Sequence, residues 1–308
     1  MKKVRWLIPV LVLTLSMGLS LAAAAKKPVL GMTTITLQAE FFQQVSKGLH
    51  DAAKKYGVDI VENDPQYDAS KQTAAIENFM ERKVDGIIVL AVDPVGVIPA
   101  IKEAVKAGFP VIAVDAQPKT DAIATFIGTA NYDAGKEMGE WVAQYIKKHM
   151  GGKANIGIVS AFNSPIQLDR QRGFEEVVKK LPGVKIVSIV DGKNVREEAL
   201  AAAENLITAN PNLDLVYGTG EPAVLGALAA VKSQNAKKVK IVGWDLTDES
   251  IAGLKQGTVL AMVQQDPYRE GYLAVENMLK VLKGQTLPKT IAVPVKIYTK
   301  DNIATFKK

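Results

Sequence analysis

Short apolar runs alternate with longer amphipathic stretches along almost the whole chain after residue 25. The apolar runs are four to eight residues long, and the stretches between them carry apolar residues at helical spacing. In the first half, the runs at 29–33, 59–62, 86–90 and 110–114 predict strands, and 41–56, 69–82 and 94–107 predict helices. Because strands that alternate with helices form parallel sheets covered on both faces, the pattern predicts an α/β fold.

The same pattern starts again in the second half. Strands are predicted at 155–159, 185–190, 215–217 and 239–242, and helices at 166–180, 196–210 and 221–234. Residues 48–61 also parallel residues 173–187, each segment beginning with glycine and continuing through a Lys-Lys pair to Ile-Val. Two copies of one layout are expected, as two similar Rossmann-like domains with parallel sheets in flavodoxin-like strand order.

The end of the chain does not begin a third copy. A strand at 259–263, a helix at 268–282 and a strand at 291–298 can complete both domains only if the chain crosses between them more than once. Crossings are predicted near 128–130, 264–266 and 292–294, which makes a three-segment hinge with a cleft beside it. The predicted domains are 26–129 plus 266–291 and 130–265 plus 292–308.

Residues 1–25 have the three-part plan of a cleavable secretory signal peptide. Lys2, Lys3 and Arg5 precede an apolar run at 7–21, and four alanines follow at 22–25. The alternative is a retained membrane anchor. Without cysteine there is no disulfide, thiolate nucleophile or lipid-bearing cysteine. The net charge of +6 falls to +3 without the three leader cations, and lysines alternate with acids, so nucleic acid is not an expected partner.

Ligands of open parallel sheets bind beyond the carboxyl ends of the strands. The residues there combine aromatic rings, carboxylates, an arginine and amides, which suit a sugar or polyol: rings pack on C–H faces, and charged groups pair with adjacent hydroxyls. The candidate ligand-binding residues are Phe41, Phe42, Asp115, Arg170, Asn194, Glu221, Trp244, Asp245 and Gln265. The alternatives are core packing for the phenylalanines and Trp244, capping for the two aspartates, and a surface ion pair for Arg170.

An enzyme is not expected. Residues 34–38 after the first strand contain no glycine, so there is no nucleotide-binding loop, and His50 and His149 lie within helical patterns. Asp115 and Asp245 could oppose each other as glycosidase carboxylates do, but hydrogen bonding to hydroxyls is the more natural role. No cofactor or metal is expected, and a DNA-binding repressor would need a helix-turn-helix where the leader stands.

At these residues the chain resembles the ribose-binding type of periplasmic sugar-binding protein, which feeds ABC importers. The resemblance rests on Phe41-Phe42 with Gly48, Val114-Asp115, Arg170-Gln-Arg-Gly173-Phe174, Leu225-Gly226-Ala227, Val242-Gly-Trp-Asp245 and Gln265-Asp-Pro267. It covers essentially all of the chain after the leader. It implies a monomeric type I periplasmic binding protein that closes around its ligand and docks on a membrane permease.

The resemblance also implies that Phe41, Phe42 and Asp115 line the pocket from one domain and Arg170, Trp244, Asp245 and Gln265 from the other. The chain departs from the ribose-type pattern at Ala39, Ala116, Asn194 and Gly220. These departures count against ribose and favour a larger or differently substituted sugar, a polyol or a furanose-like signal molecule. A sensor of the same fold, acting on a chemoreceptor or sensor kinase, is the alternative to uptake.

Overall fold

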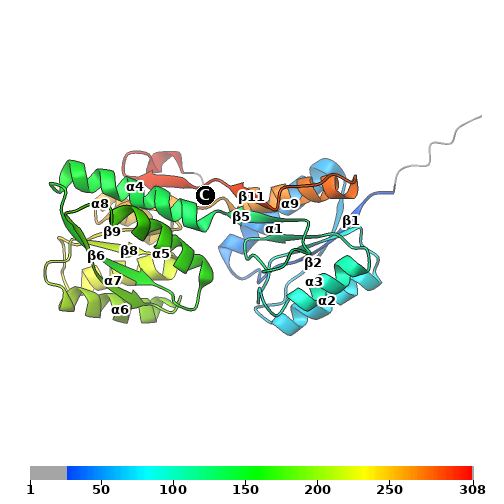
Figure 1. Ribbon diagram of the computed structural model, residues 1–308, viewed down its shortest axis with the longest axis horizontal. Helices are drawn as coiled ribbons and strands as arrows, with labels where there is room; N and C mark the ends of the chain where they lie inside the picture. Colours follow the sequence, from blue (N-terminus) through cyan, green and yellow to red (C-terminus); the bar gives the residue numbers. More distant parts are fainter. Residues whose placement is uncertain (1–25, 307–308) are drawn as a thin grey trace, which may run out of the picture.

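The structure, a computed structural model, describes residues 26–306 as two lobes that lie side by side (Figure 1). Each lobe is built on one six-stranded sheet, in the orders β11-β5-β4-β3-β1-β2 and β12-β10-β9-β8-β6-β7. The predicted signal peptide at 1–25 lies outside the described residues. No helix within 26–306 combines the length and apolarity that a bilayer crossing needs.

The strands and helices divide between the two lobes as follows. The first sheet contains β1 (Val29–Thr33), β2 (Asp59–Asn63), β3 (Gly86–Val89), β4 (Val111–Val114), β5 (Thr125–Thr129) and β11 (Thr290–Val293). The second contains β6 (Ala154–Ser160), β7 (Val184–Asp191), β8 (Leu215–Gly218), β9 (Lys240–Trp244), β10 (Val259–Gln264) and β12 (Lys296–Thr299). The helices are α1 (Glu40–Tyr56), α2 (Ala69–Glu81), α3 (Ile98–Lys106), α4 (Asn131–His149), α5 (Pro165–Val178), α6 (Arg196–Ala209), α7 (Glu221–Ser233), α8 (Asp248–Gln256) and α9 (Pro267–Leu282).

The two sheets have the same strand order, which confirms the predicted pair of flavodoxin-like domains. A matching hydrogen bond ties the start of each sheet: the Asp85 carboxylate accepts from the Val29 amide at 2.8 Å, and the Asp214 carboxylate accepts from the Asn155 amide at 2.8 Å. Each aspartate directly precedes the third strand of its lobe. All strand pairs are parallel except β10 with β12, which closes the second sheet with an antiparallel edge.

Each lobe is held by a pair of helices that cross at glycines. A side chain added at Gly48 of α1 would lie 1.9 Å from the Tyr268 carbonyl of α9, and one at Gly173 of α5 would lie 2.0 Å from the Tyr132 carbonyl of α4. Neither contact is possible for a larger residue, so these glycines let the helix backbones touch. The glycines that begin the two similar sequence segments therefore have the same structural role.

The chain passes between the lobes three times. After each of the first two passages, the helix that follows packs against the lobe that the chain has entered. After β5 of the first sheet, α4 packs against α5 of the second lobe, and after β10 of the second sheet, α9 packs against α1 of the first lobe. The third passage lies between β11 and β12. The prediction of one strand at 291–298 was wrong, because Pro294 has no amide hydrogen to donate and separates two strands of different sheets.

The third helix begins later than predicted. α3 starts at Ile98, and residues 94–97 form a non-helical turn where the first turn of the helix was predicted. The Asp93 carboxylate accepts a hydrogen bond from the amide of Val95 at 2.9 Å, two residues on. This local bond stabilises a turn in competition with the helix.

Apolar side chains cover both faces of both sheets. In β3, Ile88 packs with Leu30 and Met32 on one face, whereas Ile87 and Val89 pack with Phe79 on the other. The second sheet is likewise covered by two separate buried clusters. Such full covering leaves only the ends of the strands open to ligands.

Candidate functional site

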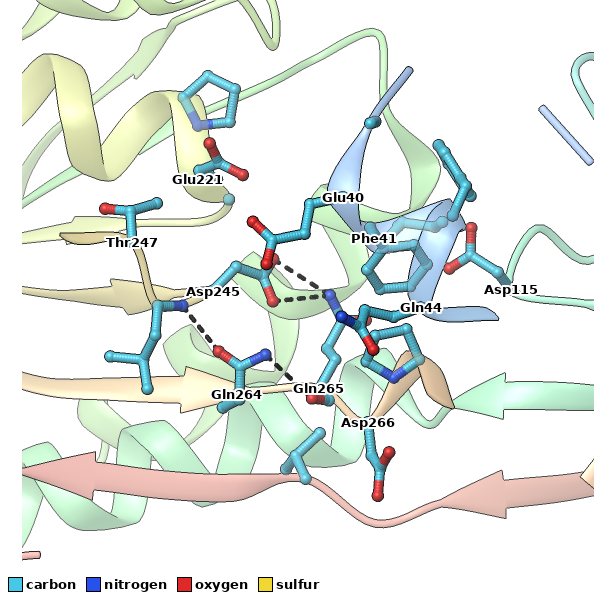
Figure 2. Close-up of a pocket in the computed structure, with 18 of the residues that line it drawn as sticks. Glu40, Phe41, Gln44, Asp115, Glu221, Asp245, Thr247, Gln264, Gln265 and Asp266 are labelled. Carbon is cyan, nitrogen blue, oxygen red and sulfur yellow. Dashed lines mark hydrogen bonds between the residues drawn. The ribbon is translucent and has the colours of Figure 1, made fainter. Parts of the chain in front are cut away.

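A cleft of about 1010 Å³ lies between the lobes at the carboxyl ends of the strands. Figure 2 shows Asp115 on one side of it, Asp245 and Glu221 on the other, and Glu40 and Phe41 of α1 between them in this view. The structure brings eight of the predicted residues together on its lining: Phe41, Phe42, Asp115, Arg170, Asn194, Glu221, Asp245 and Gln265. Trp244 is not among the lining residues.

Asp115 and Asp245 occupy equivalent places in the two lobes. Each directly follows the fourth strand of its sheet, and each has a left-handed backbone, with φ of 61° and 62°. Their amides donate to the next strand, to Ile127 O at 2.9 Å and Val263 O at 2.8 Å. Aspartate tolerates this backbone better than most residues. The shared turn directs two carboxylates from opposite lobes into one cleft.

The Asp115 carboxylate accepts no hydrogen bond from the residues within 26–306, although it is half-buried. Burial raises its pKa to about 6. Arg170 opposes that rise, and the negative charge of Asp245 adds to it. A half-buried carboxylate with free lone pairs is available to accept hydrogen bonds from a ligand.

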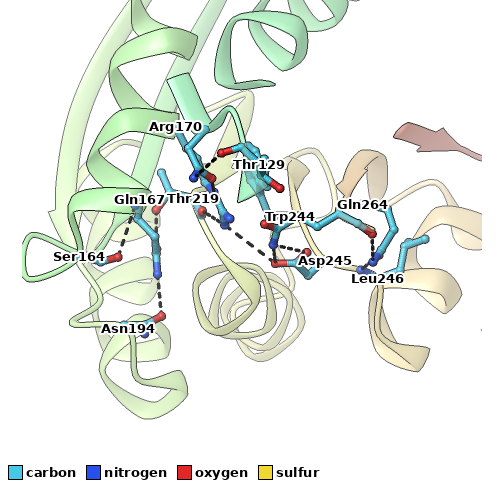
Figure 3. Close-up of polar contacts among 12 residues, drawn as sticks. Thr129, Ser164, Gln167, Arg170, Asn194, Thr219, Trp244, Asp245, Leu246 and Gln264 are labelled. Carbon is cyan, nitrogen blue, oxygen red and sulfur yellow. Dashed lines mark hydrogen bonds and ion pairs between the residues drawn. The ribbon is translucent and has the colours of Figure 1, made fainter. Parts of the chain in front are cut away.

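Arg170 reaches the cleft from α5 through a buried set of contacts (Figure 3). Its side chain is only 6 % exposed and lies 3.9 Å from the Asp245 carboxylate. The guanidinium donates to Asn131 Oδ1 at 2.8 Å and to the Thr219 carbonyl at 3.3 Å. These contacts fix the guanidinium beside Asp245, and its positive charge also limits the rise in the pKa of Asp115.

Trp244 packs against Arg170 from the interior of the second lobe. This corrects the prediction that Trp244 lines the cleft. The indole is fully buried among the apolar residues of the second lobe, and the Arg170 guanidinium lies 3.8 Å from the ring centre. The indole nitrogen donates to the Tyr217 hydroxyl at 2.8 Å. As the last residue of β9, Trp244 points to the core face of the sheet, and Asp245 after it turns into the cleft.

Gln265, which directly follows β10, holds Asp245 in place within the cleft lining. Its amide nitrogen donates to both carboxylate oxygens, at 3.0 and 3.1 Å. Burial raises the pKa of Asp245, and Arg170 and Gln265 oppose that rise. Because the Gln265 nitrogen is engaged, its oxygen must accept; that oxygen is buried and has no partner within the described residues.

Phe41 and Phe42 form an apolar wall at the start of α1. Their rings meet edge to face, 5.3 Å apart at 80°. Both are partly buried against the first-lobe core and both line the cleft, so core packing and cleft lining apply to the same residues. Exposed ring surface of this kind binds C–H faces by dispersion.

Comparison with known proteins agrees with this geometry. Residues 30–286 match the model of the periplasmic binding protein domain. The chain belongs to the periplasmic binding protein family. It is 31 % identical over 288 residues to the ABC transporter periplasmic-binding protein YphF of Escherichia coli, covering 90 % of this chain and 88 % of that protein. It is 27 % identical over 275 residues to the ribose import binding protein RbsB of Bacillus subtilis, covering 89 % and 88 %.

Solved structures share the arrangement of this periplasmic binding protein. A solute-binding protein of Actinobacillus succinogenes with bound D-allose has a TM-score of 0.81 and 26 % identity, covering 91 % of this chain and all of that one. The glucose-galactose binding protein GanP of Geobacillus stearothermophilus has a TM-score of 0.80 and 28 % identity, covering 90 % and 99 %.

Two lining residues of the second lobe, Asn194 and Glu221, differ in the hydrogen bonds that they accept. Asn194, in a left-handed turn with φ of 58°, accepts a hydrogen bond from Gln167 at 2.6 Å, which leaves its own amide hydrogens for a ligand. Glu221, in the first turn of α7, accepts no hydrogen bond within the described part of the chain. Burial raises the pKa of Glu221, and the charges of Asp245 and Glu40 add to the rise.

Two buried glutamines that support the strand ends were not among the predicted site residues. Gln72 donates to the carbonyls of Thr34 and Leu90 at 3.0 and 2.8 Å, and Gln167 accepts from the Thr219 hydroxyl at 2.7 Å. Each lies on the buried face of its helix. Gln72 is three and seven residues before the buried Ala75 and Phe79, and Gln167 is seven residues before the buried Phe174. A polar residue at a buried helical position was the available signal.

No group of three or more potential metal ligands occurs within residues 26–306.

Proposed function

We propose that this periplasmic binding protein captures a sugar or polyol in the cleft and delivers it to the membrane permease of an ABC importer. One observation carries the proposal: Asp115 and Asp245 project from equivalent strand ends of opposite lobes into one cleft that Arg170 shares. Adjacent ring hydroxyls can pair with each carboxylate, while Phe41 and Phe42 receive the apolar ring face.

The mechanism we propose is closure of the lobes around the ligand. A ligand that contacts both lobes favours the closed form by its differential affinity for that form. The three passages, after Thr129, Gln264 and Val293, serve as the hinge. Residues 26–129 with 266–291 and 130–265 with 292–308 then move as the two bodies. No bond is made or broken, because the carboxylates act as hydrogen-bond acceptors.

Three of the four departures from the ribose-type pattern line the cleft: Ala39, Asn194 and Gly220. Their small or short side chains enlarge it, which favours a ligand larger than ribose. Ala116 is buried and is not among the lining residues, so its small size adds less room. In the cell, we place the protein in the periplasm as a monomer after cleavage of residues 1–25.

The experiment is ligand identification from the purified mature protein. Native mass spectrometry of protein that retains its endogenous ligand should give the mass of a sugar or polyol, and adding that compound to stripped protein should raise the Tm. Asp245→Asn should remove the Tm shift and keep the far-ultraviolet circular dichroism spectrum. No shift with any sugar or polyol of a broad panel, or full binding by Asp245→Asn, contradicts the proposal.

A further inference from the structure

Negative charge dominates the lining of the cleft. Among the described residues, seven carboxylates line it and three cations do: Glu40, Asp115, Glu221, Asp245, Asp248, Glu249 and Asp266 against Arg170, Arg196 and Lys296. A cleft that closes on a neutral sugar must bury part of this excess. Burying an uncompensated charge is costly unless a partner accompanies it.

The cations of the lining are already engaged. Arg196 donates to both oxygens of Glu249, at 3.0 and 2.8 Å. Arg170 is held beside Asp245, and the Lys296 ammonium donates to Thr305 at 3.2 Å. The two arginines therefore serve the carboxylates beside them. Lys296 forms no ion pair within the described residues, and with it counted the lining acids still outnumber the cations by seven to three.

Three lining carboxylates accept no hydrogen bond and form no ion pair within residues 26–306: Glu40, Asp115 and Glu221. Glu40 begins α1 of the first lobe and Glu221 begins α7 of the second, so the two acids approach the cleft from opposite sides. They interact at a distance, since the charge of Glu40 contributes to the raised pKa of Glu221. The closure that we propose would bring these like charges closer together.

The cleft lining also contains a buried hydrogen-bond acceptor that no donor within 26–306 satisfies. Gln265 lines the cleft and is 7 % exposed, and its carboxamide oxygen has no donor within the described residues. The oxygen cannot exchange places with the nitrogen, because the nitrogen donates to both oxygens of Asp245. This buried acceptor, independent of the acids, calls for a donor-rich ligand.

We propose that the ligand of the cleft is a polyol that carries an ammonium group, such as an amino sugar or an aminocyclitol, with the ammonium between Glu40 and Glu221. An ammonium supplies three donors and no acceptor, and its charge offsets the carboxylates that closure buries. The hydroxyls of the same ligand donate to Asp115 and Gln265. This inference rests on the proposed function and narrows its ligand class.

The experiment compares each amine with its neutral parent by isothermal titration calorimetry at pH 7. The probes are glucosamine, galactosamine and an aminodeoxyinositol against glucose, galactose and inositol, with N-acetylglucosamine as an uncharged amide. At least one amine should bind tenfold or more tightly than its parent, and acetylation should remove the gain. Glu221→Gln and Glu40→Gln should each reduce the preference, whereas Glu197→Gln, a first-turn glutamate of α6 outside the lining, should not.

The outcomes separate the two proposals. A neutral compound that binds more tightly than every amine, or a preference unchanged in both cleft variants, overturns the ammonium inference and leaves sugar uptake standing. If neither the amines nor the neutral compounds bind, that result counts against the proposed function itself. Titrations in two buffers of different ionisation enthalpy add a second readout: an amine should bind with little proton uptake, whereas uptake of about one proton with a tight neutral ligand contradicts the inference.

Discussion

Asp115→Asn should make the ligand-free protein more stable at neutral pH while it abolishes ligand binding. The substitution keeps the size of the side chain, and asparagine also tolerates the left-handed backbone at φ of 61°. It removes the ionisation of a carboxyl that accepts no hydrogen bond within residues 26–306. The ionised Asp115 carboxylate therefore lowers the free energy of unfolding of the ligand-free protein.

The magnitude follows from the pKa of Asp115, which burial raises from 3.8 to about 6. Because the folded-state pKa is above the unfolded value, the folded protein binds this proton more tightly. The stability that the proton contributes is present below 3.8 and is lost as the pH rises through 6. A shift of this size corresponds to about 3 kcal/mol at most, of which about 2 kcal/mol is lost between pH 4.5 and 8.

Urea unfolding of ligand-free wild type and Asp115→Asn, at several pH values between 4.5 and 8, measures the effect. The free energy of unfolding of the variant should gain on that of the wild type by about 2 kcal/mol as the pH rises across this range. Asp121→Asn, an exposed change outside the cleft lining, is the control and should show no such trend. A difference that is independent of pH, or that moves in the opposite direction, refutes the reasoning.

Two further substitutions test the support of the site and of the lobes. Tyr217→Phe should lower the free energy of unfolding by about 1–2 kcal/mol, because the buried Trp244 indole loses its acceptor at 2.8 Å. It should also weaken ligand binding through Arg170. Urea unfolding and calorimetry measure the two effects, and unchanged values in both would show that Tyr217 does not support the site. Gly48→Ala should cost at least about 2 kcal/mol in urea unfolding, because the new carbon would lie 1.9 Å from the Tyr268 carbonyl; Gly57→Ala, with open space around it, isolates the effect of backbone strain, and equal losses in both would argue against close helix contact.

The two-lobe architecture could be predicted because each of its causes is local in the sequence. Apolar runs, helical periodicity and the repeated segment beginning at Gly48 and Gly173 all report on the core of one lobe. The exchange of α9 between lobes is not local, but the surplus strand and helix after residue 258 required a crossing of the chain. The helix α4 was not among the predicted elements. The segment at 291–298 was predicted as one strand with a crossing near 292–294, because apolar alternation continues across Pro294. Proline at that crossing was the signal that the strand divides there.

The lining of the site was predictable because strand ends share one edge of a sheet. That rule places Asp115, Asp245 and Arg170 near the cleft without any coordinates. It could not assign Trp244, because one residue decides whether a strand-end side chain points to the core or to the cleft. The supporting glutamines bond within their own lobes, and their polar side chains at buried helical positions were a signal that the sequence offered. The lack of partners at Glu40 and Glu221 depends instead on what the other lobe supplies, and no pattern in the chain encodes those distances.

The central claim is that one ligand bridges the two lobes. Small-angle X-ray scattering of the mature protein, with and without the compound identified by native mass spectrometry, tests it most directly. The radius of gyration should fall on binding in the wild type and should stay constant in Asp245→Asn under the same conditions. An unchanged radius in wild-type protein that calorimetry shows to be saturated would contradict closure of the lobes around the ligand.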